Sequence, residues 1–138
     1  MPALNGYSVL VTGASEGIGR GIAIAAGKAG AGVVVSALDI HAAEPVAEEI
    51  RVADGQAVAA RCDVTQRSDL EAAVACALAA FGRLDAVVHN ANDTGAGARS
   101  VEEIADSHWL PSFAVGLRTS SQRPAIKCSE ITRKARVF

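Results

Sequence analysis

Three glycines near the start of the chain have a spacing that can bind phosphate groups. Gly13, Gly17 and Gly19 follow a short apolar segment at residues 7–11 and open an alanine- and isoleucine-rich segment at residues 18–29. A strand that turns through glycines into a helix presents backbone N–H groups and the positive end of the helix to an anion. Because glycine lacks a Cβ, the backbone can turn sharply and approach a pyrophosphate closely. The segment is therefore predicted to hold the pyrophosphate of a dinucleotide.

Two further residues of this turn are candidates for contact with the ligand. We expect Ser15 to line the pyrophosphate through its hydroxyl group and Ile18 to line it through its backbone N–H. Thr12 is expected to brace the turn. The alternative is a tight turn with a purely structural role, but the strand before it and the helix after it favour binding.

Strand and helix patterns alternate along the chain, as in β-α-β units on a parallel sheet. We predict strands at residues 7–11, 33–35, 57–62 and 86–88, and helices at residues 18–29, 42–53 and 68–81. The connections are short, which implies right-handed crossovers and a strand order of 3-2-1-4. The predicted fold class is α/β, a Rossmann-like doubly wound parallel sheet that is incomplete, with about four strands. A fifth strand could start at residues 135–138, where the chain stops.

Local signals place the starts of two of these helices. Pro45 is expected in the first turn of the second helix, where its missing N–H costs little. Ser68 and Glu71 have the spacing of a capping box, which predicts that the third helix begins there.

Four motifs in order resemble those of the short-chain dehydrogenase/reductase family. The first is T-G-A-S-E-G-I-G at residues 12–19, which is similar to the family's T-G-x-x-x-G-I-G. The others are C-D-V-T at residues 62–65, H-N-A-N at residues 89–92, and a helix entry at residues 101–109 that ends in S-H-W. The resemblance covers residues 1–117, and four ordered motifs are far more specific than one.

The resemblance implies further contacts with an NAD(P) cofactor. Asp63 and Val64 match the pair that holds the adenine ring in the family, although Asp63 could equally be a loop residue that supports the next helix. Asn90 and Ala91 match two positions of the family's N-N-A-G motif at the cofactor site. Residues 1–117 are thus expected to form an NAD(P)-binding domain.

Asp39 bears on the choice between NAD and NADP. A carboxylate at the end of the second strand accepts hydrogen bonds from ribose hydroxyls and repels a 2′-phosphate. Asp39 stands one or two positions late for this role, and a helix N-cap is an equal alternative. Leu38 stands where NADP-preferring relatives often place arginine, so NAD is favoured while either cofactor stays open.

The catalytic residues that the resemblance implies are missing. The family uses a tyrosine with a lysine four residues later, plus a serine and an asparagine, to move a proton during hydride transfer. The single tyrosine is Tyr7, and Val11 stands four residues after it. Gly116 occupies the position that we align with the asparagine. No Y-x-x-x-K motif and no catalytic residue can therefore be assigned.

Composition and charge limit the other possibilities. Residues 1–117 carry 7 Lys/Arg and 14 Asp/Glu, whereas residues 118–138 carry 6 and 1 and form a divergent basic tail. Without interleaved aromatic residues, this tail is no convincing nucleic-acid site. We find no apolar run long enough for a membrane span and no leader pattern, which by default favours a cytoplasmic protein. An odd number of cysteines, Cys62, Cys76 and Cys128, favours reduced structural thiols over a disulfide framework or a metal site.

Three functional hypotheses follow. The first is an oxidoreductase of the short-chain dehydrogenase/reductase type by descent, truncated near residue 117 and inactive alone, whose substrate would be an alcohol or carbonyl. The second is a non-catalytic module that binds a nicotinamide dinucleotide. The third is a protein-interaction module. Because the fourth strand is expected to have an open edge, the chain should self-associate or be completed by a partner chain.

Overall fold

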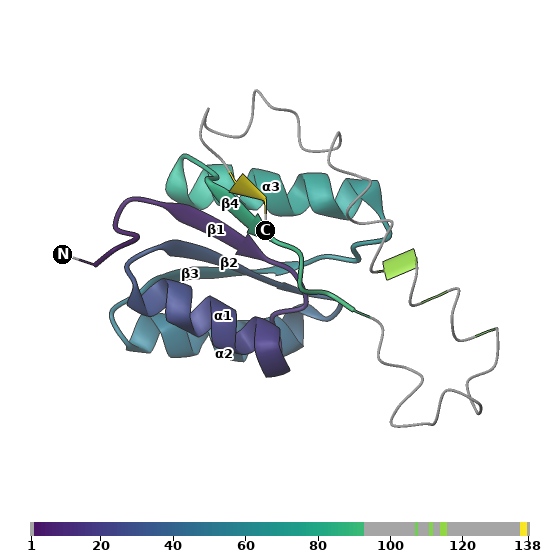
Figure 1. Ribbon diagram of the computed structural model, residues 1–138, viewed down its shortest axis with the longest axis horizontal. Coiled ribbons are helices and arrows are strands. Elements are labelled where there is room, and N and C mark those ends of the chain that lie inside the picture. Colours follow the sequence, from purple (N-terminus) through teal and green to yellow (C-terminus); the bar gives the residue numbers. More distant parts are fainter. Residues whose placement is uncertain (1, 93–106, 108–110, 112–113, 116–135, 138) are drawn as a thin grey trace.

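The computed structural model describes residues 2–92, 107, 111, 114–115 and 136–137, and in them a single parallel sheet is flanked by helices on both faces (Figure 1). The strand order is β3-β2-β1-β4-β5, and every neighbouring pair is parallel. The strands are β1 (Ser8–Val11), β2 (Gly32–Ala37), β3 (Gln56–Arg61), β4 (Ala86–Val88) and β5 (Arg136–Val137). The helices are α1 (Gly17–Lys28), α2 (Ile40–Val52) and α3 (Arg67–Phe81). The predicted fold class and the order 3-2-1-4 are confirmed.

Two apolar clusters, one on each face of the sheet, hold these layers together. The residues of β1 alternate between them: Val9 and Val11 pack toward α1 and α2, and Leu10 packs toward α3. Figure 1 shows α1 and α2 on one face and α3 on the other. Because both faces are covered, β2 is buried along its whole length, as its continuous valine run predicted.

The edge of β4 differs from the prediction of an open ladder. Arg136 pairs with Ala86 and Val137 with Val87, so the end of the chain adds a short parallel strand there. An unpaired strand edge carries backbone N–H and C=O groups that gain by such pairing. The prediction of an open edge on β4 was therefore wrong over these two residue pairs.

Two helix starts also differ from the prediction. Helix α2 begins at Ile40, so Pro45 lies beyond the first turn. Helix α3 begins at Arg67 with Gln66 as its N-cap, and no side chain caps it, so Ser68 does not form the predicted capping box. The acidic residue of its first turn, Asp69, instead accepts a hydrogen bond from the Asp63 N–H. This bond ties the start of α3 to the loop after β3.

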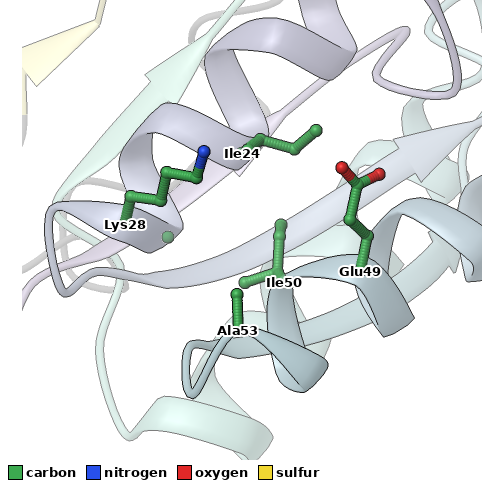
Figure 2. Close-up of a pocket in the computed structure, with 6 residues that line it drawn as sticks. Ile24, Lys28, Glu49, Ile50 and Ala53 are labelled. Atoms are coloured by element: carbon green, nitrogen blue, oxygen red, sulfur yellow. The ribbon is translucent and has the colours of Figure 1, made fainter.

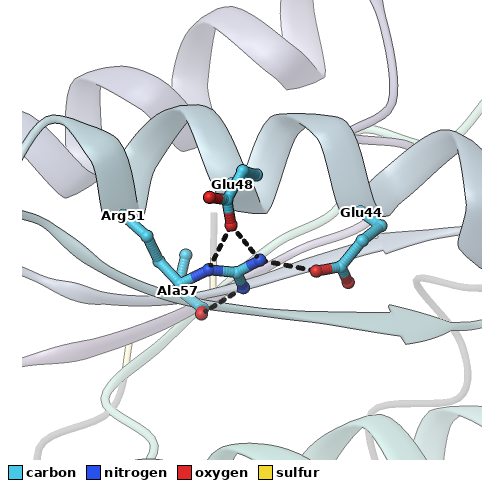
Figure 3. A network of polar contacts seen from close by, with 4 residues as sticks. All are labelled: Glu44, Glu48, Arg51 and Ala57. Atoms are coloured by element: carbon cyan, nitrogen blue, oxygen red, sulfur yellow. Dashed lines mark hydrogen bonds and ion pairs between the residues drawn. The ribbon is translucent and has the colours of Figure 1, made fainter.

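An arginine connects α2 to the sheet. Arg51 donates to Glu44 and Glu48 of its own helix and, at 3.1 Å, to the carbonyl oxygen of Ala57 in β3 (Figure 3). Both carboxylates are well exposed, so this network contributes little stability by charge alone. None of the helices in the described part of the chain is both long and apolar enough to span a bilayer.

Candidate cofactor site

The glycine turn between β1 and α1 has the backbone that its sequence predicts. Gly13 and Gly17 adopt φ values of 62° and 56°, in the left-handed region that favours glycine. A Cβ on Gly13 would lie 2.7 Å from the Cα atom of Ala91, and a Cβ on Gly19 would overlap the Gly13 carbonyl oxygen and the Asn90 side-chain amide. The turn thus packs directly on the loop that follows β4.

Thr12 and Asn90 lock this packing by hydrogen bonds. The Thr12 hydroxyl donates to the Val88 carbonyl at 3.3 Å and accepts from the backbone N–H groups of Asn90 and Ala91, each at 3.2 Å. The side-chain amide of Asn90 donates to the carbonyl oxygens of Thr12, at 3.2 Å, and Gly13, at 3.0 Å. The predicted bracing role of Thr12 is confirmed. The Asn90 amide group binds the same turn from the loop after β4, so its role in the structure is to hold the turn in place.

The start of α1 leaves backbone donors available. Glu16 is the N-cap in an extended conformation, and its side chain makes no capping hydrogen bond. Its carbonyl oxygen accepts from the Arg20 N–H at 3.1 Å. By helix geometry, the N–H groups of Gly17, Ile18 and Gly19 have no acceptor within the helix. This is the arrangement that binds an anion at a helix N-terminus.

The end of β2 forms the adjoining wall of the site. The Ala14 N–H donates to the Ser36 carbonyl oxygen at 2.9 Å, and the Ser36 hydroxyl donates to the Val11 carbonyl oxygen at 3.0 Å. Asp39 follows β2 and accepts a hydrogen bond of 2.9 Å from the His41 N–H through Oδ1, as the N-cap of α2. The N-cap alternative for Asp39 is thus confirmed, while Oδ2 has no part in the cap.

The loop after β3 is built around two carboxylates. Asp63 Oδ1 accepts from the Thr65 hydroxyl at 2.6 Å and from the Thr65 N–H at 2.9 Å, and these bonds lower the pKa of the Asp63 carboxyl. Asp69 binds the Asp63 N–H and pairs with Arg61. Val64 is buried in the cluster beneath α3, so only its backbone can face a ligand. Asp63 thus does support the local loop.

Other residues of the edge differ in exposure. Ile18 is 77% exposed and Leu38 is 68% exposed. Ser15 is half-buried, and so is Ala91. Two large apolar groups at the carboxyl end of the sheet are thus left to solvent.

The described residues offer no metal site, and a groove elsewhere on the surface is unrelated to the turn. No group of three or more His, Cys, Asp or Glu side chains is placed to hold a metal within the described part of the chain. Burial raises the pKa of the Cys62 thiol to about 11, which keeps it protonated, and Cys128 lies outside the described residues.

The groove, of about 200 Å³, lies between the C-terminal ends of α1 and α2, where Ile24, Lys28, Glu49, Ile50 and Ala53 line it (Figure 2).

Comparison with known families identifies the family to which this chain belongs. A profile of the family described as short chain dehydrogenase matches residues 7–121, which is most of the chain. The chain belongs to the short-chain dehydrogenase family. The resemblance seen in the four sequence motifs is thereby confirmed.

Several short-chain dehydrogenases are similar to this chain over part of their length. The 7alpha-hydroxysteroid dehydrogenase of Escherichia coli K12 is 44% identical over 92 residues, which are 67% of this chain and 36% of that enzyme. The cyclohexanol dehydrogenase of an Acinetobacter species is 35% identical over 113 residues, 82% of this chain and 45% of that enzyme. A solved 7 alpha-hydroxysteroid dehydrogenase, complexed with NADH and 7-oxo glycochenodeoxycholic acid, superposes with a TM-score of 0.77 at 30% identity, over 95% of this chain and 49% of that one. The chain thus spans half or less of the length of these relatives.

The fold brings most of the predicted site residues to one edge. The glycine turn, Asp39, the Asp63 loop and Asn90–Ala91 all follow the carboxyl ends of parallel strands, where ligands bind in open α/β sheets. Sequence reasoning missed Ser36, because a serine within a valine run carries no recognised local signal. Gly116, residues 101–106 and 108–109, and most of the basic tail lie outside the described residues, so those predictions stay as they were.

Proposed function

We propose that this chain binds a nicotinamide dinucleotide at the glycine turn, as the cofactor-binding part of a short-chain dehydrogenase oxidoreductase. The N–H groups at the start of α1, with the Ser15 hydroxyl, would hold the pyrophosphate. Asp39 Oδ2 would accept a hydrogen bond from the adenosine ribose. The Asp63–Val64 segment would border the adenine, and Asn90–Ala91 would border the turn from the side of β4.

One observation carries this proposal. Three N–H groups at the start of α1 have no acceptor within the helix. The side chain of the N-cap residue, Glu16, makes no hydrogen bond to them. Asn90 and Thr12 fix the turn through its carbonyl oxygens and the hydroxyl of Thr12, so the N–H groups stay available to an anion. A purely structural turn gains nothing from leaving these donors unsatisfied.

Catalysis needs a proton-transfer group in addition to the cofactor site. Hydride transfer between a nicotinamide and an alcohol or carbonyl needs a group that gives or takes a proton at the oxygen. Tyr7 precedes β1, and its ring lies 5.5 Å from the Arg83 guanidinium carbon. It stands at the amino end of a four-residue strand, about 13 Å from the turn at the other end. Tyr7 therefore cannot act at this site, and we expect no turnover by the chain alone.

NAD is the favoured cofactor in this proposal. Asp39 supplies a carboxylate at the end of β2, and no arginine follows that strand directly: Leu38 stands there. The same facts fit a non-catalytic nucleotide-binding module, because the chain has no Y-x-x-x-K motif. Self-association, a completing partner chain and cytoplasmic location stay predictions.

Calorimetric titration of the purified chain with NADH and with NADPH tests the proposal. We expect saturable binding of NADH, and binding should be lost when Gly13 is replaced by valine, because a Cβ there meets the backbone of Ala91. Gly6→Ala is a suitable control, since Gly6 also has positive φ but lies before β1 with open space around it. Absence of binding by a folded, monodisperse protein would reject the cofactor role and favour the interaction module.

A further inference from the structure

We infer that Ser36 is a positioning residue of the proposed dinucleotide site, and that its hydroxyl group sets the spacing between the glycine turn and the end of β2. This inference rests on the proposed function and deepens it, because it names the group that holds the pyrophosphate-binding segment against the ribose-binding segment. Ser36 is fully buried, so it acts through the residues that it holds and not by touching the ligand with its side chain.

Ser36 contacts the chain on both sides of the start of the turn. Its hydroxyl donates to the carbonyl oxygen of Val11, the last residue of β1, at 3.0 Å. Its carbonyl oxygen accepts from the N–H of Ala14, inside the turn, at 2.9 Å. Thr12 and Gly13 lie between these two bonds. One residue of β2 thus holds the turn at the point where it leaves β1 and again after Gly13.

The two flanks of the turn are held by different strands. From the side of β4, Thr12 and Asn90 form the hydrogen bonds described above. From the side of β2, Ser36 forms one bond through its side chain and one through its backbone. The backbone bond to Ala14 can form with any residue at position 36. The hydroxyl is therefore the part of this contact that depends on the serine.

A second buried serine in the same pair of strands makes no such bond. Ser8 stands in β1 and pairs with Gly32, at the opposite end of β2 from Ser36. Both serines are 0% exposed, but in the described part of the chain the Ser8 hydroxyl has no hydrogen-bond partner. A buried hydroxyl stabilises a protein only through the bonds that it makes. The two serines therefore share their burial and their secondary structure and differ in the bond to Val11.

The Ser36 bond matters for a ligand that spans the two segments. In this fold the pyrophosphate of a dinucleotide lies at the helix N-terminus, and the adenosine ribose lies near the end of the second strand. A dinucleotide must contact both at once, so its affinity depends on a spacing that is fixed before it binds. Without the hydroxyl, the turn is free to move away from β2, and binding must restore the spacing at a cost in affinity.

The test is calorimetric titration of the full chain with NADH. Ser36→Ala should raise the Kd by about tenfold, the equivalent of one net hydrogen bond. Ser8→Ala is the matched control: it removes a buried hydroxyl from the same pair of strands, keeps the bond between the Ser8 N–H and Asp85, and should leave the Kd unchanged. Ser36→Thr retains the hydroxyl and should recover most of the affinity. Should the alanine variant not fold, Ser36→Cys takes its place, because cysteine is close to serine in size but only a weak donor, and it should also raise the Kd.

Hydrogen exchange followed by mass spectrometry separates positioning from general stability. Ser36→Ala should speed exchange of the backbone amides in residues 13–19 and leave exchange in α3 as it is in the unmodified chain, because only the turn is released. Faster exchange to the same degree in both segments would mean that the whole domain is weakened. That result would reject a positioning role for Ser36.

The outcomes separate the two proposals. If the unmodified chain binds NADH but Ser36→Ala and Ser8→Ala change the Kd equally, the role of Ser36 is rejected and the cofactor site stands. A folded Ser36→Thr variant that binds no better than Ser36→Ala also rejects it. If NADH does not bind the folded, unmodified chain, the proposed function fails and the inference fails with it. Thermal unfolding by circular dichroism shows that each variant is folded.

Discussion

The two ends of the sheet are closed by different chemistry. At the carboxyl end, the glycine turn and the loop after β4 meet through neutral groups: the Thr12 hydroxyl, the Asn90 amide and backbone carbonyl oxygens. At the amino end, β1 and β4 meet through a charged group. Asp85 Oδ2 accepts from the Ser8 N–H at 2.9 Å and from Arg83 Nε at 2.7 Å, while the Asp85 N–H donates to the Ser8 carbonyl oxygen.

This difference shows what a ligand-binding edge requires. Asp85 is buried and its carboxylate is bound by Arg83 and the Ser8 N–H, so this carboxylate is not available to a ligand. The glycine turn is braced through its carbonyl oxygens, the Thr12 hydroxyl and the N–H groups of Thr12 and Ala14, and none of these bonds uses the N–H donors at the start of α1. A carboxylate in the position of Asp85 at the glycine turn would compete with an anionic cofactor for the same N–H donors. Four variants or conditions test this contrast.

The largest effect is expected at the carboxyl end. Gly19→Ala places a Cβ against the Gly13 carbonyl oxygen and the Asn90 amide, so the turn must open. We expect a loss of about 3 kcal/mol in the free energy of unfolding, together with loss of nucleotide binding. Urea denaturation and calorimetric titration measure the two effects.

The matched control for this variant lies two residues away. Gly21 is in the same helix, and a Cβ there would meet no atom within 4 Å beyond the backbone of the helix itself. Gly21→Ala should raise the free energy of unfolding by up to about 1 kcal/mol and leave binding unchanged. If both alanines behave alike, close packing at Gly19 is not what holds the turn.

At the amino end, Asp85→Ala should destabilise the protein by about 2 kcal/mol. It leaves the Ser8 N–H without its side-chain acceptor and Arg83 without its partner. Asp85→Asn retains one acceptor oxygen and should cost less. Nucleotide affinity of the folded fraction should be unchanged in both, and a large loss of affinity would show that the two ends are coupled.

Acid should weaken the amino end through Asp85. Burial acts to raise the pKa of Asp85, but hydrogen bonds from Arg83 and the Ser8 N–H outweigh it and leave the pKa lowered. The folded-state pKa is thus below the unfolded value of about 3.9. The stabilisation is present above that value and is lost as the pH falls through the folded-state pKa. Urea midpoints between pH 6 and pH 3 should therefore fall less steeply in Asp85→Asn, and parallel curves would contradict this.

The smallest effect concerns the cap of α2. Asp39→Ala removes the bond to the His41 N–H and should cost about 1 kcal/mol, whereas Asp39→Asn should cost almost nothing. Thermal unfolding distinguishes them. If the asparagine variant is as unstable as the alanine variant, the carboxylate stabilises more than the cap.

Local sequence patterns were sufficient for the elements of this protein. The glycine spacing, the apolar runs and the helical periodicity each lie within a window of about 15 residues, so the turn and the elements around it were predictable. The strand order was predictable from the short connections, and the family from four motifs in order along the chain. Helix starts were less predictable: the capping box at Ser68 does not form because α3 begins at Arg67 with Gln66 as its N-cap, which places Ser68 inside the first turn. Asp39 illustrates the limit, since its cap was predicted only as one of two alternatives.

The amino-acid sequence by itself determined that a phosphate-binding turn would stand between the first strand and the first helix, because glycine spacing and apolar patterning act locally. Only the tertiary structure decided how that turn is held. The Asn90 amide reaches Gly13 across 77 positions in the chain, and Asp85 reaches Ser8 across the same separation. These contacts depend on β4 lying beside β1, and side-chain direction across strands follows from the folded register.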